Sequence, residues 1–275
     1  MSENKVPLPI DRLSIMLAFI TLSMGIIYFF PPTSNEPVGS ILGFIVNFRL
    51  DIYTLLIGLI SLLSLFGALW VLQAGQQEVA ENRSLLQLIP QGILPVLSVF
   101  VSSIALREMA RNNVWWVVYV LGAVLLGVIL IAELHVQEIG TEQHPIASMG
   151  LIGLSHALFL VLVIVLKTVS TRLYITLPLI LIASGFTALR SIFLRLKGEW
   201  KVGYAVATAL LVSQLAVGLN YLFLNPVQYG LLLTGALYIL ISFSCSFSQK
   251  VSQRDLFLEP ALMLGLTLLI AFIVG

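Results

Sequence analysis

Nine apolar stretches fill almost all of the 275-residue chain, and the charged residues lie almost entirely between them. A helix that rises about 1.5 Å per residue needs about 20 apolar residues to cross roughly 30 Å of hydrocarbon. Most stretches approach or reach that length, so we expect an all-α, polytopic transmembrane helical bundle with no soluble domain. The predicted spans are Leu13–Phe30, Ile52–Leu72, Leu88–Leu106, Val114–Ala132, Ile146–Leu166, Leu173–Leu194, Val202–Leu224, Val227–Phe247 and Leu256–Val274.

The composition excludes an ordinary soluble protein. Hydrophobic residues make up 59% of the chain and charged residues 10%, whereas a soluble domain carries roughly 25% charged residues. The connections between the stretches are too short to fold separately, so we expect a single transmembrane domain over residues 1–275. The lipid bilayer is then the first partner. The net charge of +1 gives no reason to expect nucleic acid as another.

Two features qualify the number and kind of elements. The third stretch contains Pro90, Gln91 and Pro95, which a membrane helix tolerates only where neighbours satisfy the freed backbone groups. Eight spans therefore stays open beside nine. The segment Val38–Phe48 is apolar but too short to span. We interpret it as a packed loop helix, with an interfacial or re-entrant helix as the alternative.

The distribution of Lys and Arg predicts the threading, because these residues collect on the cytoplasmic side. With nine spans, nine of the 14 Lys and Arg residues fall on the side of the N-terminus and five on the other. This bias favours a cytoplasmic N-terminus in a cell membrane, although loss of the third span would reverse every later loop. The first stretch meets Pro31 and Pro32 with no small-residue cleavage pattern, so we interpret it as a retained span.

Tryptophans stand at the start of two spans. Trp115 and Trp116 open the fourth span, and Trp200 precedes the seventh. Because tryptophan is enriched at the membrane–water interface, we expect all three to be interfacial anchors.

Small residues four positions apart indicate where helices approach one another, since association in lipid depends on close packing. The seventh span carries Ala205, Ala209 and Ser213 on one stripe, with Ala216 and Asn220 near it, and we expect this helix to sit centrally. The other pairs are Ser64 and Ala68, Ala123 and Gly127, Gly153 and Ala157, Ser184 and Ala188, and Ala261 and Gly265.

His156 is the leading candidate for chemistry, because it lies at the middle of the fifth span. An ionisable group at that depth is costly unless it is paired or faces a cavity. It is either a proton-relay or ligand-binding residue, or a neutral imidazole bonded to another helix. Gly153 is one turn away, so we expect His156 to face a neighbouring helix. Adjacent helical residues do not face each other, so we expect no pair between His156 and Ser155.

Four further polar residues are candidates for substrate binding or proton relay. Arg190, near the end of the sixth span, is expected to snorkel to the interface, with a counter-charge inside the bundle as the alternative. Gln214 and Asn220 lie near the small-residue stripe of the seventh span and either join helices or bind substrate. Glu259 precedes Pro260 at the start of the ninth span. This is ordinary helix-start chemistry, with a buried proton-coupling carboxylate as the alternative.

Other chemistry has little support in the sequence. The loop after the fourth span gathers residue types that zinc accepts: Glu133, His135, Glu138, Glu142 and His144. No recognised metal motif accompanies them, and a solvated acidic loop is the better interpretation. A Ser-His-Asp arrangement, a Walker loop and a pair of haem ligands at matching depth are all missing. We therefore expect no catalytic residue, no metal and no cofactor.

Three classes of function remain, in this order. A permease-like transporter of a lipidic or weakly polar small molecule fits the number of spans. A non-catalytic membrane subunit or scaffold, joined to copies of itself or to other membrane proteins through small-residue faces, fits the scarcity of site residues. A membrane-embedded enzyme rests on His156 alone. A polar mid-membrane cavity lined by His156, Gln214 or Asn220 would favour the first class, and a solid bundle the second.

Overall fold

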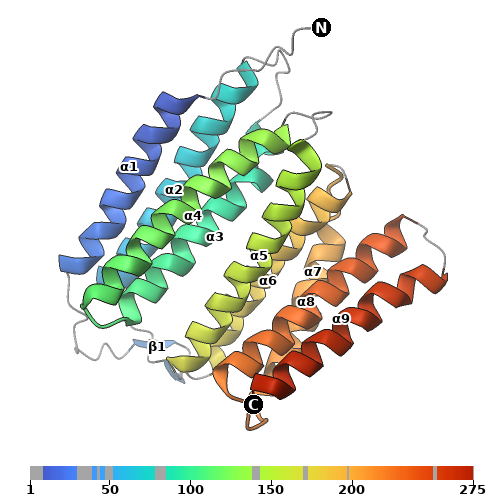
Figure 1. Cartoon of the computed structure of the whole chain (residues 1–275). Coiled ribbons are helices and arrows are strands. Elements are labelled where there is room, and N and C mark those ends of the chain that lie inside the picture. Colours follow the sequence, from blue (N-terminus) through green and yellow to red (C-terminus); the bar gives the residue numbers. More distant parts are fainter. Residues whose placement is uncertain are drawn as a thin grey trace, which may run out of the picture. The chain divides into compact units, whose positions relative to one another are not determined.

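The computed structural model describes residues 9–29, 39–41, 44–46, 52–77, 85–137, 143–169, 173–196, 198–249 and 253–274. Over these residues the chain is helical apart from two short strands and the turns (Figure 1), which confirms the all-α class. The helices are α1 (Ile10–Ile26), α2 (Ile52–Gln77), α3 (Leu85–Glu108), α4 (Asn113–Gln137), α5 (Gln143–Thr168), α6 (Leu173–Arg195), α7 (Val202–Asn220), α8 (Pro226–Ser248) and α9 (Gln253–Val274).

The prediction of eight or nine spans is confirmed. Within the described residues, the eight helices α1 to α8 are long and apolar enough to cross a membrane. The third stretch is among them, since α3 runs without a break through Pro90 and Pro95. The ninth stretch is the shorter one, with an apolar helical segment over Glu259–Ile273. The element that decides between eight and nine membrane spans is therefore α9 and not α3.

The described part of the segment Val38–Phe48 forms a hairpin, so the expectation of a helix there is wrong. Strands β1 (Gly39–Ile41) and β2 (Phe44–Val46) pair antiparallel, with Ser40 opposite Ile45. The segment is rich in β-branched Val and Ile and contains glycine, and both kinds of residue lower helix propensity. In so short a segment, pairing between two strands provides hydrogen bonds for the backbone N–H and C=O groups without a helix.

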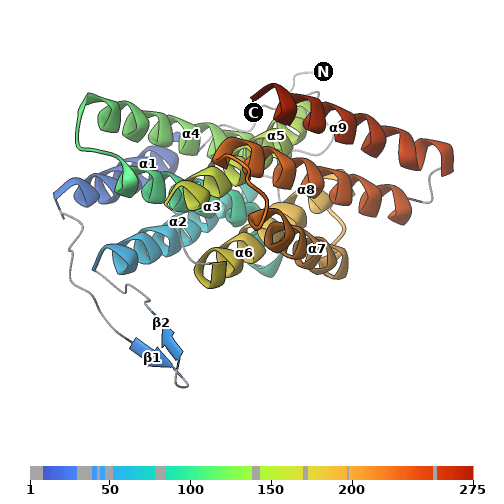
Figure 2. The same ribbon diagram turned by 90° about the horizontal axis from the view of Figure 1, so that it is seen from below.

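The chain divides into two compact units, Met1–Thr141 (unit 1) and Glu142–Gly275 (unit 2), and each is described by itself. The single domain expected from the sequence stays a prediction. In unit 1, α2 and α4 each pack against both α1 and α3 (Figures 1 and 2). The short 3₁₀ helix Ile27–Phe29 extends α1 and also touches α3. The core between these helices includes Ile20, Leu72 and Leu126, all almost fully buried.

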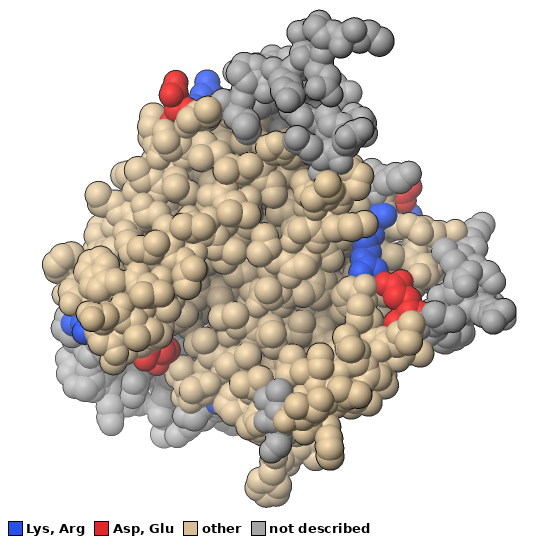
Figure 3. Space-filling model, viewed as in Figure 1, with Lys and Arg blue, Asp and Glu red and all other residues tan. Residues whose placement is uncertain are grey.

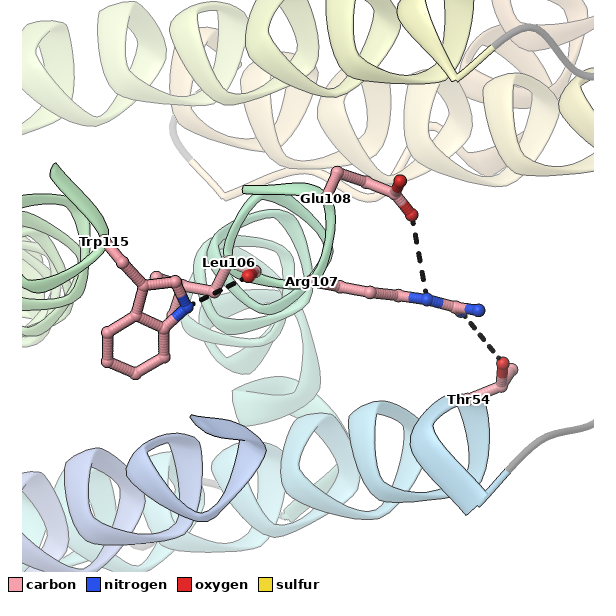
Figure 4. A network of polar contacts seen from close by, with 5 residues as sticks. All are labelled: Thr54, Leu106, Arg107, Glu108 and Trp115. Atoms are coloured by element: carbon pink, nitrogen blue, oxygen red, sulfur yellow. Dashed lines mark hydrogen bonds and ion pairs between the residues drawn. The ribbon is translucent and has the colours of Figure 1, made fainter. Parts of the chain in front are cut away.

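Trp115 belongs to the core of unit 1 and is not the interfacial anchor that we expected, since it is only 1% exposed. Its indole Nε1 donates to the carbonyl of Leu106 at 3.0 Å (Figure 4), and its ring stacks on Tyr119. Leu106 lies in the last turn of α3, where carbonyls have no intrahelical donor. Adjacent helical residues point about 100° apart, so Trp116, at 49% exposed, faces outward instead.

Arg107 ties α3 to α2 at the same end of unit 1. Its Nη1 donates to the Thr54 hydroxyl at 3.2 Å, and its Nε lies 3.7 Å from a Glu108 carboxylate oxygen (Figure 4). The guanidinium also lies 5.2 Å from the centre of the Tyr53 ring. This end of unit 1 therefore combines charged and aromatic groups in the way expected of a helix end at a membrane interface.

In unit 2, α8 packs against α5, α6, α7 and α9, whereas the described contacts of α7 are mainly with α6 and α8 (Figure 1). The expectation that the seventh span sits centrally is therefore wrong. Its stripe of Ala205, Ala209 and Ser213 is buried. A Cβ added to Gly185 of α6 would lie 3.5 Å from the Ala209 Cβ. The stripe thus marks one close interface, with α6, rather than a central position.

Small residues four apart mark buried faces in some helices and exposed faces in others. The pairs of α2 and α6 are completely buried and lie where neighbouring helices meet. The pairs of α5 and α9 are exposed on unit 2. The buried pairs are Ser64 with Ala68 and Ser184 with Ala188, and the exposed pairs are Gly153 with Ala157 and Ala261 with Gly265.

Candidate functional site

His156 lies in the interior of unit 2 and is 8% exposed. Its Nδ1 lies 2.8 Å from the carbonyl oxygen of Ile152, one turn earlier in α5. A carbonyl only accepts, so the hydrogen of a neutral imidazole sits on Nδ1 and the lone pair on Nε2. That Nε2 atom is buried and has no hydrogen-bond partner among the described residues. The histidine is thus held by one nitrogen and presents the other.

The prediction that His156 faces a neighbouring helix agrees with its burial, but the reasoning from Gly153 was wrong. Gly153 is exposed, and a Cβ added there would meet nothing within 4 Å. His156 instead meets Tyr238 of α8, with ring centres 5.5 Å apart and edge-to-face. Adjacent helical residues point about 100° apart, and residues three positions apart point about 60° apart. Gly153 and His156 therefore need not contact the same neighbouring helix.

Ser155 and His156 come closer than the sequence argument allowed, with the hydroxyl 3.4 Å from Nδ1. The Ser155 hydroxyl donates to the Ile152 carbonyl at 2.7 Å, and His156 Nδ1 uses the same oxygen. The shared acceptor brings the two side chains together. Because the serine hydrogen and Nδ1 are both engaged by that carbonyl, this contact is not a nucleophile–base pair of the kind that hydrolases use.

Tyr238 connects His156 to two charged residues from other helices. Its hydroxyl donates to a Glu259 carboxylate oxygen of α9 at 2.8 Å. Arg195, at the end of α6, lies 3.6 Å from the same oxygen, and its guanidinium is 4.8 Å from the centre of the Tyr238 ring. The four residues His156, Arg195, Tyr238 and Glu259, which we call the unit 2 polar cluster, come from α5, α6, α8 and α9.

Sequence reasoning missed Tyr238 and Arg195 as members of this cluster. A signal for Arg195 was available, because nine-span threading puts the end of the sixth span and the start of the ninth on the same membrane side. Opposite charges at those two ends, Arg195 and Glu259, are therefore able to pair. Nothing comparable marks Tyr238, which is one aromatic residue in a long apolar run.

Arg190 is completely buried, so the expectation that it snorkels to the interface is wrong. Its guanidinium lies 5.5 Å from the centre of the Phe193 ring. Arg190 shares the inward face of α6 with Thr187 and Ser191, which are also completely buried. The direction in which its Cα–Cβ bond leaves the helix, which sequence position does not give, decides this burial.

The inward face of α6 continues the polar interior of unit 2 toward α5 and α8. The hydroxyl of Ser191 lies 3.3 Å from that of Ser155 on α5. Thr187 of α6 and Ser242 of α8 are both completely buried. The Thr187 hydroxyl has no hydrogen-bond partner among the described residues, whereas Ser242 interacts with the Glu259 carboxylate. The helices α5 and α6, which pack against each other, thus each carry a buried polar atom with unused hydrogen-bonding capacity.

Asn220 and Gln214 do not join this cluster. Asn220, at the end of α7, accepts from the Lys167 ammonium at 2.8 Å, and that ammonium lies 4.9 Å from the centre of the Tyr229 ring. This contact lies at the opposite end of unit 2 from Arg195, and it ties α7 to α5. Gln214 is exposed on α7. Of the five candidates, His156 and Glu259 are thus linked through Tyr238, whereas Asn220 and Gln214 lie elsewhere on unit 2.

The zinc-type residues after the fourth span lie partly outside the described residues, since Glu138 and Glu142 fall between α4 and α5. Among those described, Glu133 is completely buried and His135 bonds through Nδ1 to the Ile131 carbonyl at 2.8 Å. In the described part of the chain no three His, Cys, Asp or Glu residues are grouped as a metal site.

The described surface is suited to lipid. Large apolar side chains are exposed along α2, α4 and α9, for example Leu59, Val124 and Phe272. On the face drawn in Figure 3 few charged side chains are visible, and most of the described surface is uncharged. Such a surface has no stable place in water, whereas hydrocarbon accommodates it.

These features define the class: the protein is a multi-pass integral membrane protein built of apolar helices. Its sequence matches the family described as Protein of unknown function (DUF5656) over residues 34–274, and the chain belongs to that family. The matched region includes α2 to α9 and begins after α1. No curated protein and no solved structure matches the chain.

Proposed function

We propose that this protein is a permease-like membrane protein that binds a small, weakly polar molecule inside unit 2, next to His156. The observation that carries this proposal is the buried Nε2 of His156, which has no hydrogen-bond partner among the described residues. Buried polar groups are nearly always hydrogen-bonded, and an unsatisfied one at membrane depth is costly. A bound molecule that donates to Nε2 removes that cost.

The chemistry of the surroundings selects the kind of molecule. A neutral imidazole with its hydrogen on Nδ1 accepts at Nε2, so the ligand supplies a hydroxyl or amide donor. The Thr187 hydroxyl offers a further donor and acceptor on the adjacent helix α6. The Tyr238 ring faces the imidazole, and Phe159, three residues after His156 on α5, is completely buried. The ligand class is therefore a neutral, amphipathic alcohol or amide rather than a metal ion or a nucleotide.

The Arg195–Glu259 pair supports a route by which a ligand enters and leaves this interior. Both residues contact Tyr238, which in turn contacts His156. Glu259 lies on α9, whose described contacts in unit 2 are mainly with α8. Its side chain is 47% exposed, and exposed ion pairs contribute only about 0–1 kcal/mol. Breaking this ion pair therefore costs little free energy, as is required of a step that admits a ligand.

His156→Phe tests the proposal, because phenylalanine keeps a ring against Tyr238 but has no Nε2. We expect purified protein in lipid nanodiscs to be stabilised against heat by members of a panel of small alcohols and amides. His156→Phe should weaken that binding roughly tenfold, about 1.4 kcal/mol. Uptake of the compounds that bind into proteoliposomes should fall in parallel.

Gln214→Leu is the matched control, since Gln214 is exposed on α7 and outside the unit 2 polar cluster. It should bind and transport like the unaltered chain. Binding that is equal in His156→Phe and in the unaltered protein would remove the basis of the proposal. So would a panel from which no compound binds.

A non-catalytic membrane subunit is the second candidate, and the exposed small-residue pairs favour it. Gly153 and Ala157 on α5 are exposed, and helix faces of this kind let another helix approach closely. The partner is a second copy or another membrane protein. Gly153→Leu should then shift the native mass of the detergent-extracted protein, whereas an unchanged mass in that variant argues against this interface.

An enzyme centred on His156 has less support than either candidate. It needs a carboxylate bonded to the imidazole, in the manner of a general acid–base pair. Among the described contacts Glu259 bonds to Tyr238 and Arg195 instead. His156 Nδ1 bonds to a backbone carbonyl.

We also propose that the protein resides in a cell membrane with its N-terminus in the cytoplasm. The Lys and Arg excess on the N-terminal side supports this orientation. A reporter active only in the cytoplasm, fused ahead of Met1, should be active. Activity only of a reporter that needs export would reverse the orientation.

A further inference from the structure

The inward face of α3 is the most polar buried surface in unit 1. Gln91, Ser98 and Ser102 recur at spacings of seven and four, so they share one face of the helix. Their exposed fractions are 4%, 0% and 8%. Ser103 follows Ser102 in sequence, points about 100° away from this face and is completely buried. No polar row of this length is buried on α1, α2 or α4 within the described residues of the unit.

α3 is also the most buried of the eight apolar spans. Of its most apolar stretch 72% is buried, whereas the highest value among the other seven spans is 44%. A polar face on such a helix does not meet hydrocarbon. α3 packs against α2 and α4, and Ser102 lies at the α4 interface, where a Cβ on Gly122 would be 3.0 Å from its hydroxyl.

Three buried hydroxyls, two on α3 and one on α2, lack the hydrogen-bond acceptor that helical serines ordinarily have. Elsewhere in unit 1 buried or half-buried hydroxyls donate to the carbonyl one turn earlier, as Ser61 does to Ile57 at 2.8 Å. The hydroxyls of Ser98 and Ser103 on α3 and of Ser64 on α2 are completely buried. None of the three has a hydrogen-bond partner among the described residues.

Two glycines mark close approaches between α3 and its neighbouring helices. A Cβ added to Gly122 of α4 would lie 3.0 Å from the Ser102 hydroxyl, so α4 is in close contact there. A Cβ added to Gly92 would lie 2.7 Å from a Leu65 methyl of α2. Ser98 lies two turns further along α3 than Gly92, away from that close approach. Pro90 and Pro95 additionally supply no N–H to the α3 backbone ladder.

We propose that Ser64, Gln91, Ser98, Ser102 and Ser103, which we call the serine seam, hold bound water molecules inside unit 1. A hydroxyl with no partner in an apolar interior costs several kcal/mol relative to water, and three such hydroxyls are buried in this unit. Water supplies both donors and acceptors, and a buried water typically makes about three hydrogen bonds. Small neutral hydroxyl compounds can replace it. The seam is a second polar interior, independent of the one around His156.

Cysteine accessibility tests the seam directly. The one cysteine of the chain, Cys245, is first replaced by alanine in the full chain. Three variants are then made in this background, and each exchanges a hydroxyl for a thiol of similar size: Ser64→Cys, Ser98→Cys and Ser103→Cys. The probe is 2-aminoethyl methanethiosulfonate, which reacts with thiolates, and a thiolate forms readily only where water solvates it. Intact folding is checked by gel filtration and by the unfolding temperature.

Ile20→Cys is the control, because Ile20 is on α1 and is almost fully buried in the apolar core of unit 1. Leu59→Cys, on the exposed apolar side of α2, reports reaction from lipid. We expect Ser98→Cys and Ser103→Cys to react at least about tenfold faster than both controls, since water at the seam raises the thiolate fraction. Rates equal to that of Ile20→Cys would overturn the proposal.

A second measurement covers cysteine variants that fold poorly. Ser103→Val removes the hydroxyl and fills its volume with methyl groups. If the seam is dry, this variant loses an unsatisfied polar group and its unfolding temperature rises. If the seam holds water, the variant displaces that water from its remaining partners and the unfolding temperature falls. His156→Phe should leave cysteine reactivity at the seam unchanged, so failure of this proposal and failure of ligand binding in unit 2 are told apart.

Discussion

Trp115→Ala should lower the free energy of unfolding by about 3 kcal/mol, the lower end of the roughly 3–5 kcal/mol range for core tryptophans. The lower end applies because lipid solvates apolar groups in separated helices nearly as well as a core does. The variant leaves a cavity beside Tyr28 and Tyr119, whose rings lie 4.9 and 5.5 Å from the Trp115 ring. It also removes the indole donor from the Leu106 carbonyl.

Unfolding of the detergent-solubilised protein by sodium dodecyl sulfate measures this effect, and the adjacent tryptophan is the control. Trp116 is 49% exposed, so Trp116→Ala should cost much less. Trp115→Phe retains an aromatic ring and loses chiefly the hydrogen bond, for which we expect about 1 kcal/mol. If Trp115→Ala and Trp116→Ala are equally stable, Trp115 is not a core residue.

Gly235→Ala should destabilise unit 2 by roughly 1–3 kcal/mol, the usual cost of overpacking. A Cβ at this position of α8 would lie 2.5 Å from Thr267 Cγ2 and 2.9 Å from Thr267 Cβ on α9. Threonine is short and β-branched, so it has little freedom to turn aside. α9 must shift instead, which also disturbs the Tyr238–Glu259 hydrogen bond.

Gly265→Ala separates this clash from the effect of glycine itself. Gly265 lies on α9, and a Cβ added there would meet nothing within 4 Å. Since glycine inside a helix costs about 0.5–1 kcal/mol relative to alanine, this variant should be neutral or more stable. The heat-induced unfolding temperatures of the two variants should therefore move in opposite directions. A shift of the same sign in both would contradict the close approach of α8 and α9.

Much of the fold follows from the sequence, and the elements that do not are instructive. Long apolar runs predicted the helices, including α3 with its two prolines. The hairpin over Gly39–Val46 was missed, because apolar length alone does not separate a short helix from a strand pair. The central helix of unit 2 was also missed. Small residues on α7 are visible in the sequence, but the close approaches of α8 at Gly230 and Gly235 depend on which helices are neighbours.

The candidate site shows the same division. His156 was found because an ionisable residue in the middle of an apolar run is unusual. Its partners were not, since Tyr238 lies 82 positions away by number, on a helix whose position the sequence does not give. Arg190 and Arg195 are close in sequence. One is completely buried, and the other pairs with Glu259.

By itself, the sequence determined that this protein resides in a membrane and is made of helices. In hydrocarbon, a continuous apolar run can satisfy its backbone polar groups only by forming a helix. It also determined the small number of polar residues available at depth. Only the tertiary structure decided how those residues are used. Helix neighbours and the rotation of each helix brought His156, Tyr238, Glu259 and Arg195 into one cluster and left Gln214 exposed. The physical reason is that lipid is nearly as apolar as leucine, so apolar content gives no preference for one helix face or neighbour over another. Close packing and hydrogen bonds between residues distant in sequence make that choice.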